Sequence, residues 1–259
     1  MATPARDAIR QGLSVLIALA ALGAPAVAQP SGLVVSVAAS LHDALVEIAG
    51  LYRAATGMTV ALNPGGSNTL ARQIVEGAPV GLFLSADEIQ MDIVDKAGRV
   101  APGTRTVLLT NELAVVVSGD ARASTTVQDV LDGRLARLAM GEPSAVPAGV
   151  YARRWLEHEK AWDRVAAKVV PFPTVRAVLS AVEAGRVDAG IVYRTDAMTA
   201  NVRVIARVSS TAVPSLNIVQ PAAVIAGPME KEARRFLEFL KGDQARAVFV
   251  KRGFGIHGR

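Results

Sequence analysis

Short apolar runs that alternate with amphipathic segments most constrain what this chain can fold into. Leu33–Val37 is a β-branched run typical of a buried strand, and apolar residues recur at helical spacing from Leu41 to about Ala55. The same patterns predict strands at 59–62, 82–84, 113–117 and 191–193, and helices at 69–76, 86–97 and from 127. Strands separated by helices favour an α/β fold with largely parallel sheets.

The C-terminal part of the chain has a different pattern. Two apolar runs, 204–208 and 218–225, flank a polar segment at 209–211. The chain then closes with one predicted helix, whose buried face carries Ala233, Phe236, Leu237 and Leu240. No linker divides the 259 residues, so the chain fits two lobes joined by close crossings.

The first 28 residues have the features of a secretory signal peptide. Arg6 and Arg10 precede an apolar run from Leu13 to Leu22, and Ala26-Val27-Ala28 fits the cleavage pattern. This run is shorter than the roughly 20 residues of a membrane-spanning helix. Because the chain has no cysteine, it has no site for a disulfide or a lipid-modified cysteine. We therefore expect a soluble mature chain, starting at Gln29, in the periplasm of a Gram-negative cell.

Composition and charge exclude several classes of protein. With 51% hydrophobic residues the chain cannot remain disordered in water. Without residues 1–28 the chain carries 26 basic and 22 acidic residues, a net charge of +4. This modest, dispersed charge permits an anionic partner, and together with export it argues against nucleic-acid binding.

Small, polar or glycine-bearing turns stand just before several predicted helices. They are Ser40, Gly66-Ser67-Asn68, Val146-Pro147-Ala148-Gly149 and Pro173-Thr174. A helix start presents unpaired N–H groups and a partial positive charge, so several starts that converge on one cleft could hold an anion. The same residues are also ordinary helix caps, and spacing alone leaves both interpretations open.

An ordered set of motifs carries a resemblance to a known family. The motifs are Ala38-Ala39-Ser40-Leu41, Ser67-x-Thr69-Leu70-Ala71-Arg72-Gln73-Ile74, Leu84-Ser85-Ala86-Asp87, Gly141-Glu142-Pro143, Val146-Pro147-Ala148-Gly149, Val175-Arg176 and Gly190-Ile191-Val192-Tyr193. In this order they resemble the periplasmic molybdate-binding proteins, and the resemblance covers essentially the whole mature chain.

The resemblance implies a two-lobed, type II periplasmic binding protein fold with the ligand in the cleft between lobes. We expect lobe I to comprise 29–110 and a return segment at 216–259, and lobe II to comprise 111–215. The implied function is that of a monomeric receptor for an ABC importer. It would bind molybdate, and also tungstate, deliver it to a membrane permease, and need no cofactor.

The resemblance also implies which residues contact the ligand. Ser40 and Ser67 would donate from hydroxyl and backbone N–H, Ala148 and Val175 from backbone N–H, and Tyr193 from its hydroxyl. Molybdenum would be held as an oxyanion, with no side chain coordinating the metal itself. A site of donors alone suits a fully deprotonated dianion and disfavours hydrogen phosphate, whose proton would find no acceptor.

Two alternatives stay open on the sequence alone. A receptor for another tetrahedral oxyanion, such as sulfate, would share the fold and the site, because selectivity depends on cavity size. A secreted serine hydrolase is disfavoured, because the segment around Ser67 lacks the second glycine of a nucleophile elbow. Only His42, His158 and His257 could act as its base. Arg194 also has two interpretations, a solvated side chain or a rim arginine that steers anions or bridges the closed lobes.

Overall fold

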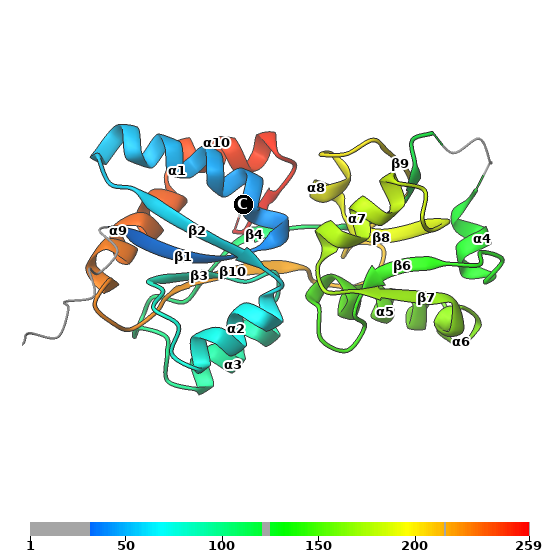
Figure 1. Cartoon of the computed structure of the whole chain (residues 1–259), viewed down its shortest axis with the longest axis horizontal. Helices are drawn as coiled ribbons and strands as arrows, with labels where there is room; N and C mark the ends of the chain where they lie inside the picture. The colour runs from blue at the N-terminus through cyan, green and yellow to red at the C-terminus, as the bar shows by residue number, and fades with distance from the viewer. Residues whose placement is uncertain (1–31, 121–124, 215, 259) are drawn as a thin grey trace, which may run out of the picture. The chain divides into compact units, whose positions relative to one another are not determined.

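Two β-sheets, each covered by helices, organise the part of the chain that the structure describes (Figure 1). The computed structural model describes residues 32–120, 125–214 and 216–258, and the predicted signal peptide, 1–28, lies outside these residues. One sheet has the strand order β11-β4-β10-β3-β1-β2, and the other has the order β7-β6-β8-β5-β9. We call the first sheet with its helices lobe I and the second with its helices lobe II.

The strands of lobe I are β1 (Leu33–Ala38), β2 (Val60–Gly65), β3 (Leu82–Leu84), β4 (Thr106–Thr110), β10 (Val219–Val224) and β11 (Gly255–Ile256). Its helices are η1 (Ala39–Leu41), α1 (His42–Thr56), α2 (Ser67–Val75), α3 (Glu88–Lys96), α9 (Glu230–Lys241) and α10 (Asp243–Lys251). The strands of lobe II are β5 (Leu113–Ser118), β6 (Leu138–Gly141), β7 (Val169–Phe172), β8 (Ala189–Tyr193) and β9 (Val202–Val208). Its helices are α4 (Val127–Leu131), α5 (Pro147–His158), α6 (Trp162–Val165), η2 (Ala166–Lys168), α7 (Val175–Glu183) and α8 (Arg194–Ala197).

Both sheets are mixed, so the prediction of largely parallel sheets is wrong. Strand β1 pairs in parallel with β2 and β3, and β6 with β7 and β8, as the strand–helix alternation predicts. Strands β10 and β5, however, run antiparallel to their neighbours. These are the strands by which the chain enters the other sheet, and no crossover helix precedes them to make parallel pairing possible.

Two crossings connect the lobes. The first is Asn111-Glu112, between β4 and β5, and the second is the segment 209–218, between β9 and β10. The Asn111 N–H donates to the carbonyl of Ile218 at 3.0 Å, which ties the crossings together. The Asn111 side chain also donates to the Thr195 hydroxyl at 2.9 Å. The predicted lobe limits at 110/111 and 215/216 remain predictions about which segments move together.

Helix α1 follows its apolar periodicity closely. Its buried residues are Ala44, Leu45, Ile48 and Tyr52. The Tyr52 ring meets the rings of Phe236 and Phe239 edge-on, at centroid distances of 4.9 and 5.1 Å, and so joins α1 to α9. The helix ends at Gly57, whose φ of +76° is in the left-handed region that favours glycine.

The chain closes with two helices, whereas the sequence predicted one. Gly242, with φ −76° and ψ 163°, is extended and separates α9 from α10. The second helix buries Ala245, Val248 and Phe249, a short apolar face that the sequence pattern did not single out. Within the described ranges, no helix is long and apolar enough to cross a membrane.

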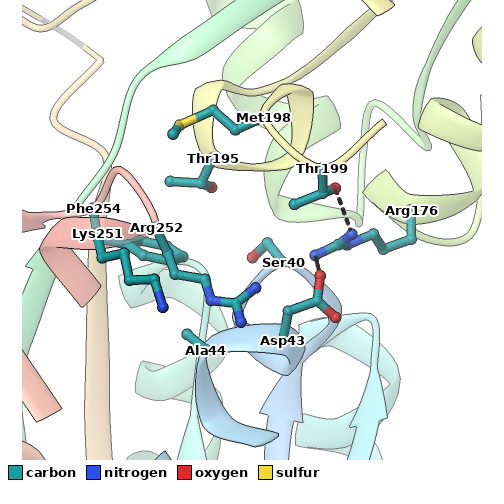
Figure 2. A pocket seen from close by; sticks show the side chains of 10 residues that line it. All are labelled: Ser40, Asp43, Ala44, Arg176, Thr195, Met198, Thr199, Lys251, Arg252 and Phe254. Atoms are coloured by element: carbon teal, nitrogen blue, oxygen red, sulfur yellow. Dashed lines mark hydrogen bonds and ion pairs between the residues drawn. The ribbon is translucent and has the colours of Figure 1, made fainter. Parts of the chain in front are cut away.

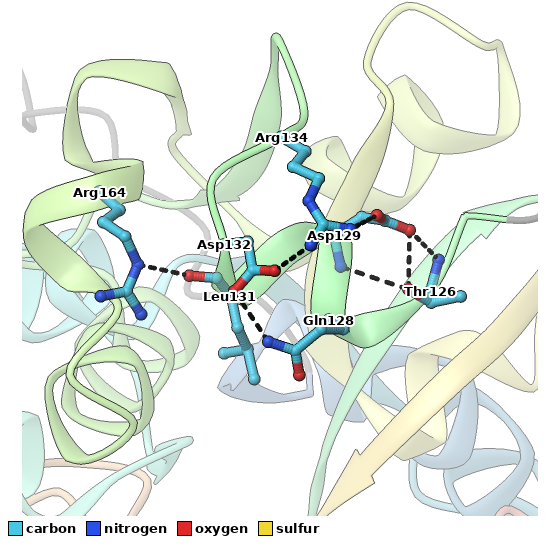
Figure 3. A network of polar contacts seen from close by, with 7 residues as sticks. All are labelled: Thr126, Gln128, Asp129, Leu131, Asp132, Arg134 and Arg164. Carbon is cyan, nitrogen blue, oxygen red and sulfur yellow. Dashed lines mark hydrogen bonds and ion pairs between the residues drawn. The ribbon is translucent and has the colours of Figure 1, made fainter.

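Polar contacts fix the start of the short helix α4 in lobe II (Figure 3). Thr126 and Asp129 form a capping box, in which the Asp129 N–H donates to the Thr126 hydroxyl and the Thr126 N–H donates to the Asp129 carboxylate at 2.9 Å. Arg134 donates to the same carboxylate at 2.8 Å, and Arg164 donates to the Leu131 carbonyl at 3.0 Å. Helix α7 also starts after a threonine cap, Thr174.

Candidate functional site

A small cleft between the lobes contains all five residues that the sequence predicts as oxyanion contacts. Lobe I contributes Ala38, Ala39, Ser40, Gly65, Gly66, Ser67 and Ala86 to its lining, and lobe II contributes Val146, Pro147, Ala148, Thr174, Val175 and Tyr193. About 20 Å³ is open to the centre of a water molecule. That is little more than one water-sized site, so the cleft suits a small ion and not an organic solute.

Lobe I presents two serines at helix starts. Ser40 lies in η1, is 5% exposed, and its hydroxyl oxygen has no hydrogen-bond partner among the described residues. Ser67 is the first residue of α2, and its hydroxyl oxygen accepts the Ala86 N–H at 3.0 Å. Because that oxygen accepts from Ala86, the hydroxyl proton of Ser67 remains available to a ligand.

Lobe II presents the starts of α5 and α7. Helix α5 begins at Pro147, and no side chain caps it, so the N–H of Ala148 at its second position is left without a capping partner. Thr174 caps α7 by accepting the N–H of Ala177 at 3.2 Å. This contact satisfies the third residue of the helix and leaves the N–H of Val175, the first residue, for a ligand.

Tyr193 ends β8 and brings a hydroxyl to the cleft. Its side chain is 1% exposed, and the hydroxyl donates to the Ala86 carbonyl across the lobes at 3.5 Å, long for a hydrogen bond. Burial raises the pKa of Tyr193 well above its ordinary value. The hydroxyl therefore keeps its proton and acts as a donor.

The described residues that line this cleft include no charged side chain and no histidine. Positive potential comes instead from the starts of α2, α5 and α7. This agrees with the interpretation that several helix starts converge on one cleft and could hold an anion. Ser67 has no histidine beside it to act as a base, which argues against the hydrolase alternative. Among the described residues, no group of three or more His, Asp or Glu side chains is placed to hold a metal ion.

The chain is similar to a known protein family over nearly all of its described residues. Residues 33–255 match the profile of the family described as bacterial extracellular solute-binding protein. The chain belongs to this family. Its members are binding proteins, so the prediction that the chain is not an enzyme is confirmed.

Individual relatives within the solute-binding proteins are similar over most of the chain. The molybdate-binding protein ModA of Escherichia coli is 35% identical, over 91% of this chain and 93% of its own length. A putative ABC transporter substrate-binding lipoprotein, YvgL of Bacillus subtilis, is 38% identical, over 86% of this chain and 85% of its own length. The structure of the Azotobacter vinelandii periplasmic molybdate-binding protein matches with a TM-score of 0.76 and 27% identity, over 86% of this chain and 98% of that one. This likeness confirms the predicted fold class.

Asp87 stands in one of the quoted motifs, but the sequence did not show that it is a buried acid at a helix start. Asp87 is 2% exposed and caps α3 by accepting the Gln90 N–H at 2.9 Å. Burial raises the pKa of Asp87 to about 6, and the charge of Asp87 contributes to raising the pKa values of Tyr151 and Tyr193. In a capping box, the cap residue is followed three positions later by Glu or Gln, and Asp87-x-x-Gln90 has this spacing. The spacing could therefore have identified this helix start.

Replacing Asp87 with asparagine is expected to change how stability depends on pH. Between about pH 4 and pH 6 the folded protein binds the Asp87 proton more tightly than the unfolded chain does. The contribution of Asp87 to the free energy of unfolding is therefore largest at low pH and falls as pH rises. The Asp87→Asn variant keeps the acceptor for Gln90, so its stability relative to wild type should rise by up to about 3 kcal/mol from pH 4 to pH 7. Urea unfolding across this range measures the difference, with Asp243→Asn at an exposed position as the control for net charge. Parallel curves for Asp87→Asn and wild type would contradict the assignment.

A larger cavity adjoins the cleft, because Ser40 lines both (Figure 2). It measures about 310 Å³, and its lining is Ser40, Asp43, Ala44, Arg176, Thr195, Met198, Thr199, Lys251, Arg252 and Phe254. Its basic groups already have carboxylate partners, since Arg176 contacts Asp43, and Lys251 and Arg252 both contact Glu47. The smaller cleft, in contrast, has no charged side chain in its lining.

Arg194 connects the lobes. Its guanidinium donates to the carbonyl of Gly253 in lobe I, and its Nε lies 3.4 Å from a carboxylate oxygen of Glu112 in the first crossing. The Arg194 side chain is 29% exposed. These contacts favour the bridging interpretation over the solvated one.

Proposed function

We propose that the chain is a periplasmic receptor that captures molybdate, and also tungstate, and delivers it to the membrane permease of an ABC importer. The observation that carries this proposal is the small cleft to which both lobes bring hydrogen-bond donors without any charged side chain. Relatives named as molybdate-binding proteins, at 35% and 32% identity, support the choice of ligand. The predicted signal peptide supports the periplasmic location, and we expect the receptor to act as a monomer.

The proposed contacts are Ser40, Ser67, Ala148, Val175 and Tyr193. Two serines with hydroxyl and N–H, two further N–H groups and one phenol supply about seven donors. A dianion without protons can accept from all of them. Hydrogen phosphate would direct its own proton at a donor, at a cost of roughly 1–3 kcal/mol.

Calorimetric titration of residues 29–259 with molybdate, tungstate, sulfate and phosphate, each alone, tests this function. We expect one-to-one binding of molybdate and tungstate, and phosphate weaker by roughly 5- to 150-fold because of its proton. Sulfate, which is smaller, should also bind less tightly. Sulfate binding as tight as molybdate would make the chain a broader oxyanion receptor, and no heat with any of the four anions in folded protein would overturn the proposal.

A further inference from the structure

We propose that Arg176 is a positioning residue whose ion pair with Asp43 holds the cleft closed and slows release of the bound oxyanion. The part of this inference that concerns release rests on the proposed function. The part that concerns closure stands on the contacts between the lobes. Arg176 does not line the small cleft, so it acts through the elements that do.

The guanidinium of Arg176 has partners in both lobes. In lobe II its Nε lies 3.0 Å from a carboxylate oxygen of Asp196, and its Nη1 donates to the Thr199 hydroxyl at 2.9 Å. Its Nη2 reaches into lobe I and donates to a carboxylate oxygen of Asp43 at 2.8 Å. Figure 2 shows Arg176 between Thr199 and Asp43, at the edge of the larger cavity. Lobe II thus holds the Arg176 side chain through two contacts, and the third contact is with lobe I.

The partners of Arg176 differ in burial, and this decides which contact can open. The side chain of Asp196 is 0% exposed, whereas that of Asp43 is 38% exposed. Burial raises the pKa of Asp196 to about 7, and the charge of Arg176 opposes this. Asp196 and Thr199 belong to the same lobe as Arg176, so the pair with Asp196 persists when the lobes separate. Only the pair with Asp43 has to break.

The Arg176–Asp43 pair links the two turns that carry proposed ligand contacts. Arg176 directly follows Val175 at the start of α7, and Asp43 lies three residues after Ser40, in the first turn of α1. Forming the ion pair therefore brings the N–H of Val175 and the hydroxyl of Ser40 toward the same cleft. Because the fixed fork of arginine is already oriented by Asp196 and Thr199, little side-chain freedom is lost when Asp43 arrives.

The contact contributes to closure more than to the fold. Each lobe has its own sheet, so separating the lobes breaks the pair without unfolding either one. Apparent affinity is the affinity of the closed form multiplied by the fraction of molecules that are closed. A partly exposed ion pair changes such an equilibrium by up to about fivefold, and the change should appear in the release rate.

Release of molybdate from the full mature protein, followed by stopped flow, tests the first part. Asp43→Asn keeps the size of the side chain and should speed release by up to about fivefold, with little change in the association rate. Added salt should speed release from wild type more than from the variant. Asp243→Asn is the matched control, because Asp243 is an exposed acid in the first turn of α10 and forms no ion pair among the described residues. A release rate equal to wild type in Asp43→Asn would overturn the role in release.

The distance between the lobes in protein without molybdate tests closure independently of any ligand. The chain has no cysteine, so Ala55→Cys in lobe I and Ala184→Cys in lobe II, both at exposed positions, allow a pair of spin labels. Asp43→Lys, which places two cations together, should shift the distances to larger values, and Asp43→Asn should do so less. Unchanged distances in both variants would overturn the inference. If wild type does not bind molybdate, the proposed function fails, and this measurement still decides closure.

Discussion

Replacing Val175 with proline is expected to weaken molybdate binding by about 10- to 150-fold without damaging the fold. Proline removes the N–H that α7 presents to the cleft, and a charge-assisted hydrogen bond is worth roughly 1.5–3 kcal/mol. The first position of a helix accepts proline, and Thr174, with φ −147° and ψ 155°, already has the extended conformation that proline requires before it. Calorimetry with molybdate measures the loss.

Val127→Pro is the matched control for this variant. Val127 is also the first residue of a helix that follows a threonine cap, and Thr126, with φ −114° and ψ 164°, is extended in the same way. Val127 is not among the residues that line the cleft. Proline there should leave molybdate affinity unchanged. If Val175→Pro also binds as wild type does, the N–H of Val175 is not a ligand contact.

Replacing Gly66 with alanine is expected to prevent full closure of the cleft. A Cβ at Gly66 would lie 2.8 Å from the carbonyl oxygen of Pro173 in the opposite lobe. The backbone of Gly66, with φ −67° and ψ 133°, suits any residue. The Cβ would also lie 2.8 Å from Oδ1 of Asn68 in the same lobe, but that side chain can move, so the conflict with backbone arises when the lobes meet. Overpacking of this kind costs roughly 1–3 kcal/mol, which predicts a similar loss of roughly 5- to 150-fold for molybdate and tungstate.

Calorimetry with both anions, together with thermal unfolding of the protein without ligand, separates a closure effect from a folding defect. We expect the Gly66→Ala variant to melt near the wild-type temperature and to bind both anions less tightly. Gly50→Ala is the control, because a Cβ at Gly50 in α1 meets nothing within 4 Å. Wild-type affinity in Gly66→Ala would mean that the bound form is more open than this structure.

Much of the fold could be predicted because short-range patterns determine it. The apolar run at 33–37 corresponds to β1, and the run Leu113–Val117 lies in β5, whose five residues there are fully buried between β8 and β9. Strand direction could not be predicted in the same way, because it depends on where the chain crosses between sheets. The separation of α9 from α10 at Gly242 was missed for a related reason, since glycine alone does not say whether a helix resumes.

The candidate site was harder to predict from the residues alone. Ser40 and Tyr193 lie far apart in the sequence, and nothing in their local patterns says that their turns meet. The resemblance to a known family supplied that grouping, and the structure places all five residues around one cleft. Arg176 and Asp43 are separated by 133 positions, so neither periodicity nor spacing could reveal their contact.

The strand order of lobe I has a consequence for how the chain folds when its N-terminus emerges first. Strand β10 stands between β3 and β4, yet residues 219–224 come after the whole of lobe II in the chain. When the N-terminus emerges first, the edges of β3 and β4 that pair with β10 therefore have no partner strand until nearly the whole chain is available. Contacts so distant in sequence form slowly. We expect lobe II, whose strands are contiguous at 113–208, to fold first and lobe I to complete last.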